Sequence, residues 1–361
     1  MIASAAIGTG VTVFQVVVSE RLKMTKKNEP PKNDEPEPLQ HTFKMFRARI
    51  TAPFKTRAKH FFHDLITPLR PHASSKRLIN EFSTFVAEHP VADEYAEAER
   101  WLAGDHGISL RDAEELIVSA INNRRPFSFI RMGDGEGRWM FEFDADSALA
   151  AHSNKTARNV WFWNSRTFPP EEFWNELRKS YLDADLVGIN PGFRIRFEAG
   201  QSEHSDVHVL GYVGVILGNQ YIFQKKSSPA EWRAIPNWAP MIWNDSGFFQ
   251  RLFSITKNAH IISPHRNLDK FIHERFGVTI HNVLIPSENN PLVTPISISR
   301  PHFPDVYDSV ASWIKETCPA LVLVAGGVFG KIYSGMIRET GGVAIDVGSV
   351  VDSWMGLRTR P

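Results

Sequence analysis

The stretch ALVLVAGGVFGKIYSGMIRETGGVAIDVG, residues 320–348, places three predicted elements in close succession. Apolar, branched residues at 320–327 predict a strand, residues 329–340 predict a helix, and residues 341–348 predict another strand. Glycine pairs mark both junctions, which is typical of chain turns. A strand, a helix and a strand in this order indicate two parallel strands of one sheet with the helix packed over them.

The same alternation runs upstream of this unit. Ser109 is a favourable N-cap with Asp112 three residues further on, and apolar residues from 110 to 121 recur at helical spacing. A strand at 127–132 follows at once. Further strands are predicted at 185–190, 259–265 and 278–286, and further helices at 267–277 and 303–316. The fold class is therefore α/β, a Rossmann-like domain over 109–361 with a mainly parallel sheet flanked by helices.

Two segments precede this domain. Residues 1–42 are expected to be a disordered segment and linker, because 25–42 is rich in proline and charge and lacks apolar periodicity. The apolar stretch 2–18 makes a weak membrane anchor the alternative. Residues 43–108 have the composition of a helical extension. Basic residues follow the apolar stretch instead of preceding it, unlike a secretory signal, so we expect a cytoplasmic protein with membrane association as the alternative.

Composition narrows the classes of partner. The formal net charge is +1 over 361 residues, which argues against a broad nucleic-acid surface. The single cysteine, Cys318, excludes an intrachain disulfide and fits a reducing compartment. It precedes an apolar run, and we interpret it as a buried packing residue.

The segment FSFIRMGDGEG, residues 127–137, carries the first candidate site. Asp134 and Glu136 follow a strand end closely, where ligands bind in open α/β sheets. Two neighbouring carboxylates repel unless a cation lies between them, and hard oxygen ligands suit Mg²⁺ or Mn²⁺. Gly133 and Gly135 would let a phosphate approach, and Arg131 would pair with it. A solvent-exposed acidic turn is the structural alternative.

The glycine loop at 326–331 is the second candidate site. Gly326, Gly327 and Gly330 would expose backbone N–H groups at a helix N-terminus, which attracts anions, and Lys331 adds a positive charge. Asp346 closes the next strand, where an acid can hold a ribose hydroxyl. The spacing matches neither a Walker A loop nor the dinucleotide fingerprint. A glycine turn that serves only helix packing is the alternative.

Both segments resemble one family, the GT-D-fold glycosyltransferases, which were once filed as a domain of unknown function. Its opening pattern is approximately S-h-h-R-h-G-D-G-E, where h is apolar, and Ser128 to Glu136 match it. Residues 321–354 resemble its closing segment, a glycine loop, a helix and an h-D-h-G strand end. Residues 283–290 match the middle of the family more loosely, and the resemblance covers about 110 to 356.

The resemblance implies a hexosyltransferase-like enzyme of glycan biosynthesis. It implies a nucleotide-sugar donor, most often a uridine diphosphate (UDP) sugar, and a divalent ion at the D-x-E of Asp134 and Glu136. The sugar would pass to a hydroxyl on a glycan or glycoprotein. Many relatives carry His after the D-h-G, where this chain has Ser349. If that His assists metal or phosphate binding, another group must replace it here, and Asp352 is near in sequence.

Several assignments stay open at this level. An inverting transferase needs a general base, and the sequence does not choose among Glu198, Glu203, His204, Asp245 and His265. The tryptophans between 150 and 255 are interpreted as core residues, with sugar stacking as the alternative. A metal-dependent phosphotransferase or nucleotide hydrolase, and a non-catalytic nucleotide-sugar-binding module, are the competing functions.

Overall fold

The computed structural model describes residues 73–357, with gaps at Asp134, 142–146, Asn164, 203–205, Ser227, 229–230, 257–258 and 288–299. These residues all belong to one compact unit, Leu69–Pro361. The predictions for residues 1–42 and the first part of the helical extension lie outside the described residues. So does the placement of Asp134.

A seven-stranded sheet with strand order β3-β2-β1-β7-β6-β4-β5 forms the centre of the unit, and neighbouring strands pair in parallel. The strands are β1 Phe127–Arg131, β2 Leu186–Ile189, β3 Arg233–Pro236, β4 Ala259–Ser263, β5 Ile280–Leu284, β6 Leu321–Val324 and β7 Val343–Asp346. β1, β2, β6 and β7 are almost continuously apolar and buried, as expected for parallel strands covered on both faces. The predicted α/β class with a mainly parallel sheet is confirmed.

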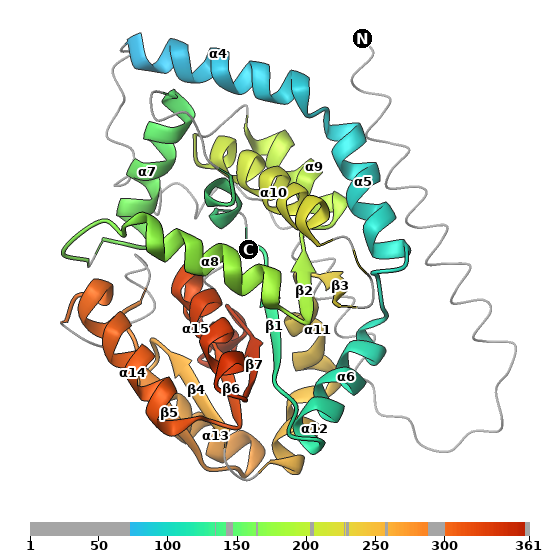
Figure 1. Ribbon diagram of the computed structural model, residues 1–361, viewed down its shortest axis with the longest axis vertical. Helices are drawn as coiled ribbons and strands as arrows, with labels where there is room; N and C mark the ends of the chain where they lie inside the picture. The colour runs from blue at the N-terminus through green and yellow to red at the C-terminus, as the bar shows by residue number, and fades with distance from the viewer. Residues whose placement is uncertain are drawn as a thin grey trace, which may run out of the picture. The chain divides into compact units, whose positions relative to one another are not determined.

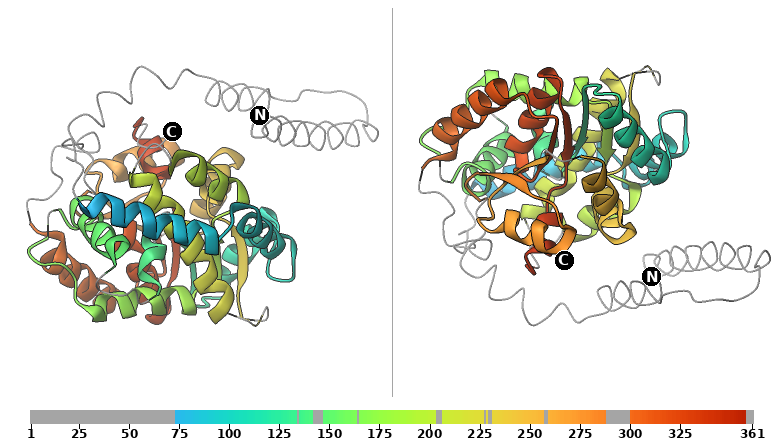
Figure 2. Two further views of the ribbon diagram at one scale, coloured as in Figure 1. Left: turned by 90° about the horizontal axis from the view of Figure 1, so that it is seen from above. Right: turned by 90° about the horizontal axis from the view of Figure 1, so that it is seen from below.

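Helices cover the two faces of the sheet, and alternate strand residues point to each face. Ile130 of β1 belongs to the core beneath one helical layer and Phe129 to the core beneath the other. The first layer holds α8 Glu171–Asp183, α14 Tyr307–Thr317 and α15 Gly327–Glu339. The second holds α6 Leu110–Asn122, α11 Ala239–Ser246, α12 Phe248–Ile255, α13 Leu268–Phe276 and α16 Val350–Trp354. The view from below in Figure 2 shows helices on both sides of the sheet.

A third group of helices gathers beyond the carboxyl ends of β1 and β2 (Figure 1). It consists of α4 Ala73–Glu88, α7 Ala148–Val160, α9 Gly192–Ser202 and α10 Asp206–Lys225, and α5 Val91–Ala103 packs against α9 and β3. A separate core of apolar residues, which includes Phe85, Ile195 and Tyr212, holds these helices together. Two short turns of helix, Glu136–Trp139 (η2) and His302–Val306 (η3), complete the unit.

Local sequence signals decide several boundaries. Ser109 caps α6 as predicted, because its side chain accepts a hydrogen bond from the Asp112 amide at 3.1 Å. The sequence did not predict β3, a four-residue edge strand that ends in proline. The interpretation of Cys318 was wrong: it is exposed, because it ends α14 in a left-handed conformation and the buried apolar run begins only at Leu321. Within the described part of the chain, no helix has the length and apolar character to cross a bilayer.

Candidate active site

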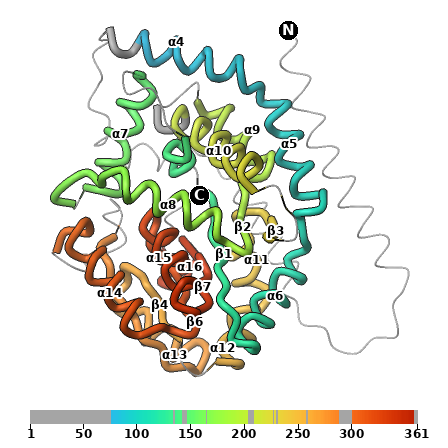
Figure 3. Tube along the Cα trace, in the orientation of Figure 1, coloured from blue at the N-terminus to red at the C-terminus, as the bar shows by residue number. Residues whose placement is uncertain are grey.

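Four adjacent strands end side by side and deliver the candidate residues. β3, β2, β1 and β7 are neighbours in the sheet, so Asn237, Asn190, the segment 131–136 and Asp346 meet at one edge. The Cα trace in Figure 3 shows β7 beside β6 and β1, with α16 close by. The structure therefore brings the two sequence motifs together, although they lie 200 residues apart in the chain.

A buried ion network joins the two motifs. The Lys331 ammonium contacts the Asp346 carboxylate and lies 3.7 Å from Glu136 Oε1, and the Lys331 and Glu136 side chains are each only 6% exposed. The Arg131 backbone N–H and Nε both donate to Asp346, at 3.2 and 3.3 Å. The two cations and two carboxylates balance one another, which is what makes their burial tolerable. Asp346 is thus held by Lys331 and Arg131 at the position where the sequence predicted a ribose ligand.

Protonation within this network follows from burial and charge. Burial alone would raise the pKa of the Asp346 carboxyl, but the charges and hydrogen bonds of Lys331 and Arg131 outweigh it and leave the pKa below its usual value. Burial, with the negative charges of Glu136 and Asp346, raises the pKa of Tyr181 well above its usual value. The Tyr181 hydroxyl therefore keeps its proton and acts as a hydrogen-bond donor.

Backbone groups at the end of β1 are held from several directions. The Tyr181 hydroxyl donates to Arg131 O at 2.9 Å, and Met132 N–H donates to Gly188 O at 2.7 Å. Asn237 Nδ2 donates to Met132 O at 2.8 Å, Gly133 N–H donates to Glu136 Oε1 at 2.8 Å, and Asn190 Nδ2 approaches Gly133 O at 3.4 Å. With the Arg131 N–H on Asp346, all six polar backbone groups of residues 131–133 have partners. The backbone that precedes residue 134 is thus held in one conformation by hydrogen bonds.

The asparagines in this arrangement were missed by the sequence reasoning. Asn237 Nδ2 also donates to Asn190 Oδ1 at 2.7 Å, and Asn190 exchanges two backbone hydrogen bonds with the Asn219 amide. Arg131 Nη1 donates to Asn237 O at 3.1 Å. A usable signal existed, since Asn190 and Asn237 each follow a short apolar run directly.

Glycines of the motif make room for three different partners. A Cβ atom on Gly133 would lie 2.4 Å from Glu136 Oε2, and one on Gly135 would lie 2.5 Å from the Trp161 ring. A Cβ atom on Gly137 would lie 1.8 Å from the Gly214 carbonyl oxygen of α10. A larger residue would therefore displace the Glu136 or Trp161 side chain at the first two positions, and at Gly137 it would strike backbone, independently of any ligand.

The loop at 326–331 has a packing role that the structure makes explicit. Gly326 caps α15, Gly327 has a φ of +54°, and Gly330 N–H donates to Gly326 O at 3.0 Å. A Cβ atom on Gly330 would lie 3.1 Å from the Val324 side chain of β6, so this glycine sets the approach of α15 to the sheet. The first N–H groups of α15 have no partner within the helix, which is the feature that attracts anions to a helix N-terminus.

The fit of a divalent cation can be judged at Glu136. Its Oε1 takes the contacts from Gly133, Tyr181 and Lys331, while Oε2 lies against Gly133, the neighbour of Asp134 in the chain. Among the described residues there is no group of three or more His, Cys, Asp or Glu that could hold a metal ion. An ion held by Glu136 Oε2 and Asp134 would therefore take its remaining ligands from water and from phosphate oxygens, as Mg²⁺ commonly does. The carboxylate oxygens of these two residue types have the chemistry that such an ion prefers.

The candidate general bases differ in their surroundings. Glu198 is 2% exposed and pairs with Arg194, Asp245 is exposed on α11, and Glu203 and His204 lie outside the described residues. His265 is 2% exposed, and its Nε2 lies 2.8 Å from Asp352 Oδ1. Asp352 thus contacts His265 from α16, four residues after Gly348. None of these geometries assigns the base.

The tryptophans of the middle segment divide by burial. Trp174, Trp232 and Trp243 are core residues, as predicted. Trp163 is 43% exposed, and Trp161 and Trp238 are partly buried. The interpretation as core therefore holds for three of the six.

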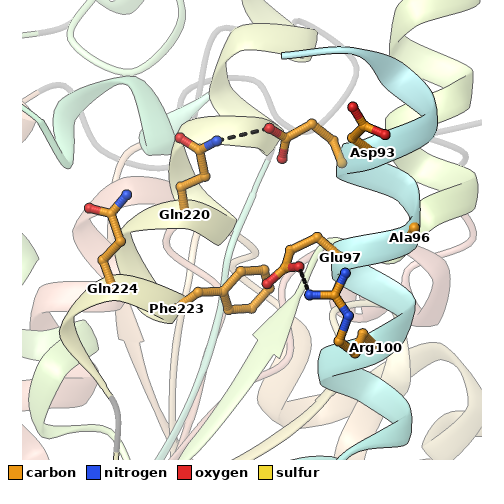
Figure 4. Close-up of a pocket in the computed structure, with 8 residues that line it drawn as sticks. Asp93, Ala96, Glu97, Arg100, Gln220, Phe223 and Gln224 are labelled. Atoms are coloured by element: carbon orange, nitrogen blue, oxygen red, sulfur yellow. Dashed lines mark hydrogen bonds and ion pairs between the residues drawn. The ribbon is translucent and has the colours of Figure 1, made fainter. Parts of the chain in front are cut away.

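A surface pocket of about 460 Å³ lies between α5 and α10 (Figure 4). Its lining includes Asp93, Glu97, Arg100, Gln220 and Phe223. Glu97 and Arg100 pair with each other on its α5 wall. No residue of the ion network belongs to this lining, so the pocket is a separate feature of the surface.

No family model matches the chain. No curated protein matches it either. Three solved structures are similar to it: one described as a domain of unknown function 1792 with a distinct glycosyltransferase fold, a selenomethionine form of that domain, and a new glycosyltransferase (DUF1792) from Streptococcus sanguinis. The first two are 15% identical with a TM-score of 0.40 over 68% of this chain and 81% of theirs. The third is 13% identical with a TM-score of 0.43 over 70% and 86%.

Proposed function

We propose that this protein is a metal-dependent glycosyltransferase. Its donor would be a nucleotide-diphosphate sugar, specifically a UDP-sugar, and its acceptor a hydroxyl group of a glycan or glycoconjugate. The observation that carries the proposal is the fixed backbone of residues 131–133, which precede Asp134 in the chain, together with the buried Glu136 that accepts the Gly133 N–H. Such fixation suits a residue that must meet a ligand at a defined position.

Each residue has a part in this proposal. Asp134 and Glu136 Oε2 would hold Mn²⁺ or Mg²⁺, and the ion would supply positive charge to the departing diphosphate. Arg131, whose side chain is 18% exposed, would donate to a phosphate oxygen with the part of its guanidinium that Asp346 and Asn237 do not occupy. Backbone N–H groups of the first turn of α15 would face the diphosphate from the next strands of the sheet.

Lys331 has a different part from the one its sequence position suggests. Its ammonium is buried between Asp346 and Glu136, so we propose that it holds both carboxylates in place. Glu136 in turn accepts the Gly133 N–H. Lys331 would therefore act on the donor through Glu136 and the backbone before Asp134.

The test is a panel of nucleotide sugars incubated with the full chain and Mn²⁺, with release of nucleoside diphosphate as the signal. We expect turnover with one class of donor and its loss in excess chelator. Asp134→Asn and Glu136→Gln should each lower turnover about a hundredfold. Asp93→Asn, an exposed carboxylate on α5, is the control and should leave it unchanged. Full activity in chelator would refute the metal.

The same panel separates the competing functions. Hydrolysis of nucleoside triphosphates without any action on nucleotide sugars would indicate a phosphotransferase or nucleotide hydrolase. A rise in melting temperature with Mn²⁺ and UDP, without turnover of any donor, would indicate a binding module, because a ligand of the native state stabilises it.

A further inference from the structure

Exposed aromatic side chains lie directly beside the candidate active site. Phe193 is 55% exposed and Phe197 is 37% exposed on α9, and Ile242 is 41% exposed on α11. Trp238, the N-cap of α11, is partly buried, and its ring centroid lies 6.4 Å from that of Phe193. We call these four residues the aromatic platform. They include three of the six large apolar side chains described as exposed, so exposure is concentrated here.

The platform is continuous with the fixed backbone before Asp134. Phe193 follows Asn190 by three residues, and Trp238 follows Asn237 directly. These two asparagines donate to Gly133 O and Met132 O, and Asn237 O accepts from Arg131. The residue after β2 and the residue after β3 thus form hydrogen bonds at the candidate site. Within three residues further along the chain, each segment carries an aromatic ring of the platform.

Helical spacing gives the platform a single face. Phe193 and Phe197 are four residues apart on α9, and Trp238 and Ile242 have the same spacing at the start of α11, so each pair lies on one side of its helix. The Arg194 guanidinium lies 5.2 Å from the centre of the Phe197 ring and pairs with the buried Glu198. Flat rings beside a held charged group are the surface that a sugar ring uses, with its C–H face on the ring and its hydroxyls on the polar group.

We infer that the aromatic platform is the acceptor subsite, and that it binds a saccharide through stacking on Phe193 and Trp238. This inference rests on the proposed function. Open exposure favours an acceptor glycan that continues into solvent over the nucleotide of the donor, since a small ligand is ordinarily buried over most of its surface. The subsite would position the acceptor hydroxyl beside the strand end that carries Asp134.

The test compares Phe193→Ala and Phe193→Tyr with wild type. Ile79→Ala is the matched control, because Ile79 is 61% exposed on α4 and does not belong to the aromatic platform. The first measurement is saturation-transfer NMR with methyl glycosides of glucose, galactose and N-acetylglucosamine and with their disaccharides. We expect transfer to a saccharide in wild type, Phe193→Tyr and Ile79→Ala, and a loss in Phe193→Ala. The acceptor KM should rise about tenfold in Phe193→Ala, on the scale of one aromatic contact.

The remaining measurements separate the ways in which the inference can fail. Donor hydrolysis and the Kd for UDP with Mn²⁺ should stay unchanged in Phe193→Ala. A weakened UDP Kd would make the platform a base-stacking surface, and a change in oligomeric state by light scattering would make it an interface between copies; either result overturns the acceptor subsite. If wild type neither binds UDP nor turns over any donor, the proposed function fails, whereas unchanged acceptor KM and NMR transfer in an active Phe193→Ala refute this inference alone.

Discussion

Replacement of Lys331 by methionine tests the buried ion network most directly. Methionine keeps the length of the side chain and removes its charge, which leaves Asp346 and Glu136 facing each other with Arg131 as their nearest cation. Removal of one partner from a buried ion pair costs roughly 3–5 kcal/mol, since an uncompensated charge stays in the interior. A domain has about 5–15 kcal/mol of stability in total, so Lys331→Met should lose about a fifth of it or more.

Urea unfolding followed by far-UV circular dichroism measures this loss. Lys179→Met is the control, because Lys179 pairs with Glu339 at the surface and the two side chains are 62% and 49% exposed. Such a surface pair contributes under about 1 kcal/mol. The double variant Lys331→Met, Asp346→Asn should recover part of the loss, since it removes one of the two carboxylates that the Lys331 ammonium neutralises.

One result would refute the structural role of Lys331. If Lys331→Met unfolds within about 1 kcal/mol of wild type, the ammonium does not stabilise buried carboxylates as a buried pair requires. A tenfold or greater loss of UDP affinity in that stable variant would instead make Lys331 a direct phosphate ligand, as the sequence predicts. Calorimetric titration of UDP with Mn²⁺ against both lysine variants distinguishes the two roles.

Four further predictions follow from single contacts. Burial lowers the pKa of His302 to about 3, so below pH 6.5 the unfolded chain binds a proton at this residue that the folded chain does not bind. The free energy of unfolding should therefore fall by about 2 kcal/mol from pH 6.5 to pH 5. Urea midpoints measured against pH should show this slope in wild type and lose it in His302→Gln. Gly348→Ala should lower the urea midpoint more than Gly277→Ala. Both glycines have positive φ, so alanine at either position is strained by about 1–2 kcal/mol, but only at Gly348 would the new Cβ also meet a neighbour, Arg131 Nη2 at 1.6 Å. Gly137→Ala should lower the melting temperature through a clash with the Gly214 carbonyl, whereas Gly200→Ala on α9, with nothing within 4 Å, should raise stability by up to about 1 kcal/mol. A chain that begins at His41 should fold and keep its calorimetric UDP affinity, because residues 1–42 carry no core pattern and no candidate ligand.

Periodicity predicted most of the sheet, because a parallel strand between two helical layers is a short apolar run with glycine or polar residues at its ends. Six of the seven strands were found in this way, from β1 at Phe127 to β7 at Val343. β3 escaped because Arg233–Pro236 is an edge strand of four residues, with arginine at one end and proline at the other. Its pairing with β2 depends on tertiary contacts, which a segment of four residues does not encode.

Motifs predicted which segments meet at the candidate site but not how their charges are shared. Arg131, Glu136, Lys331 and Asp346 do come together, yet each was assigned to an external ligand, and the structure pairs them first with one another. Contacts of this kind join residues such as Arg131 and Asp346, which are 215 positions apart, and no local pattern encodes them. Tyr181 illustrates the same limit, because only its burial beside Glu136 distinguishes it from any other helical tyrosine.

The glycines of residues 133–137 admit a physical account that changes what the motif means. A flexible acidic turn would accept alanine at any of these positions, whereas here each added methyl group would strike a different element: the Glu136 carboxylate, the Trp161 ring or the α10 backbone. The motif therefore packs closely between the end of β1, η2 and α10, and this packing on three sides makes it rigid. Packing on three sides therefore accounts for these glycines within the protein, and under the proposed function it would also fix the residues that flank Asp134 in the chain.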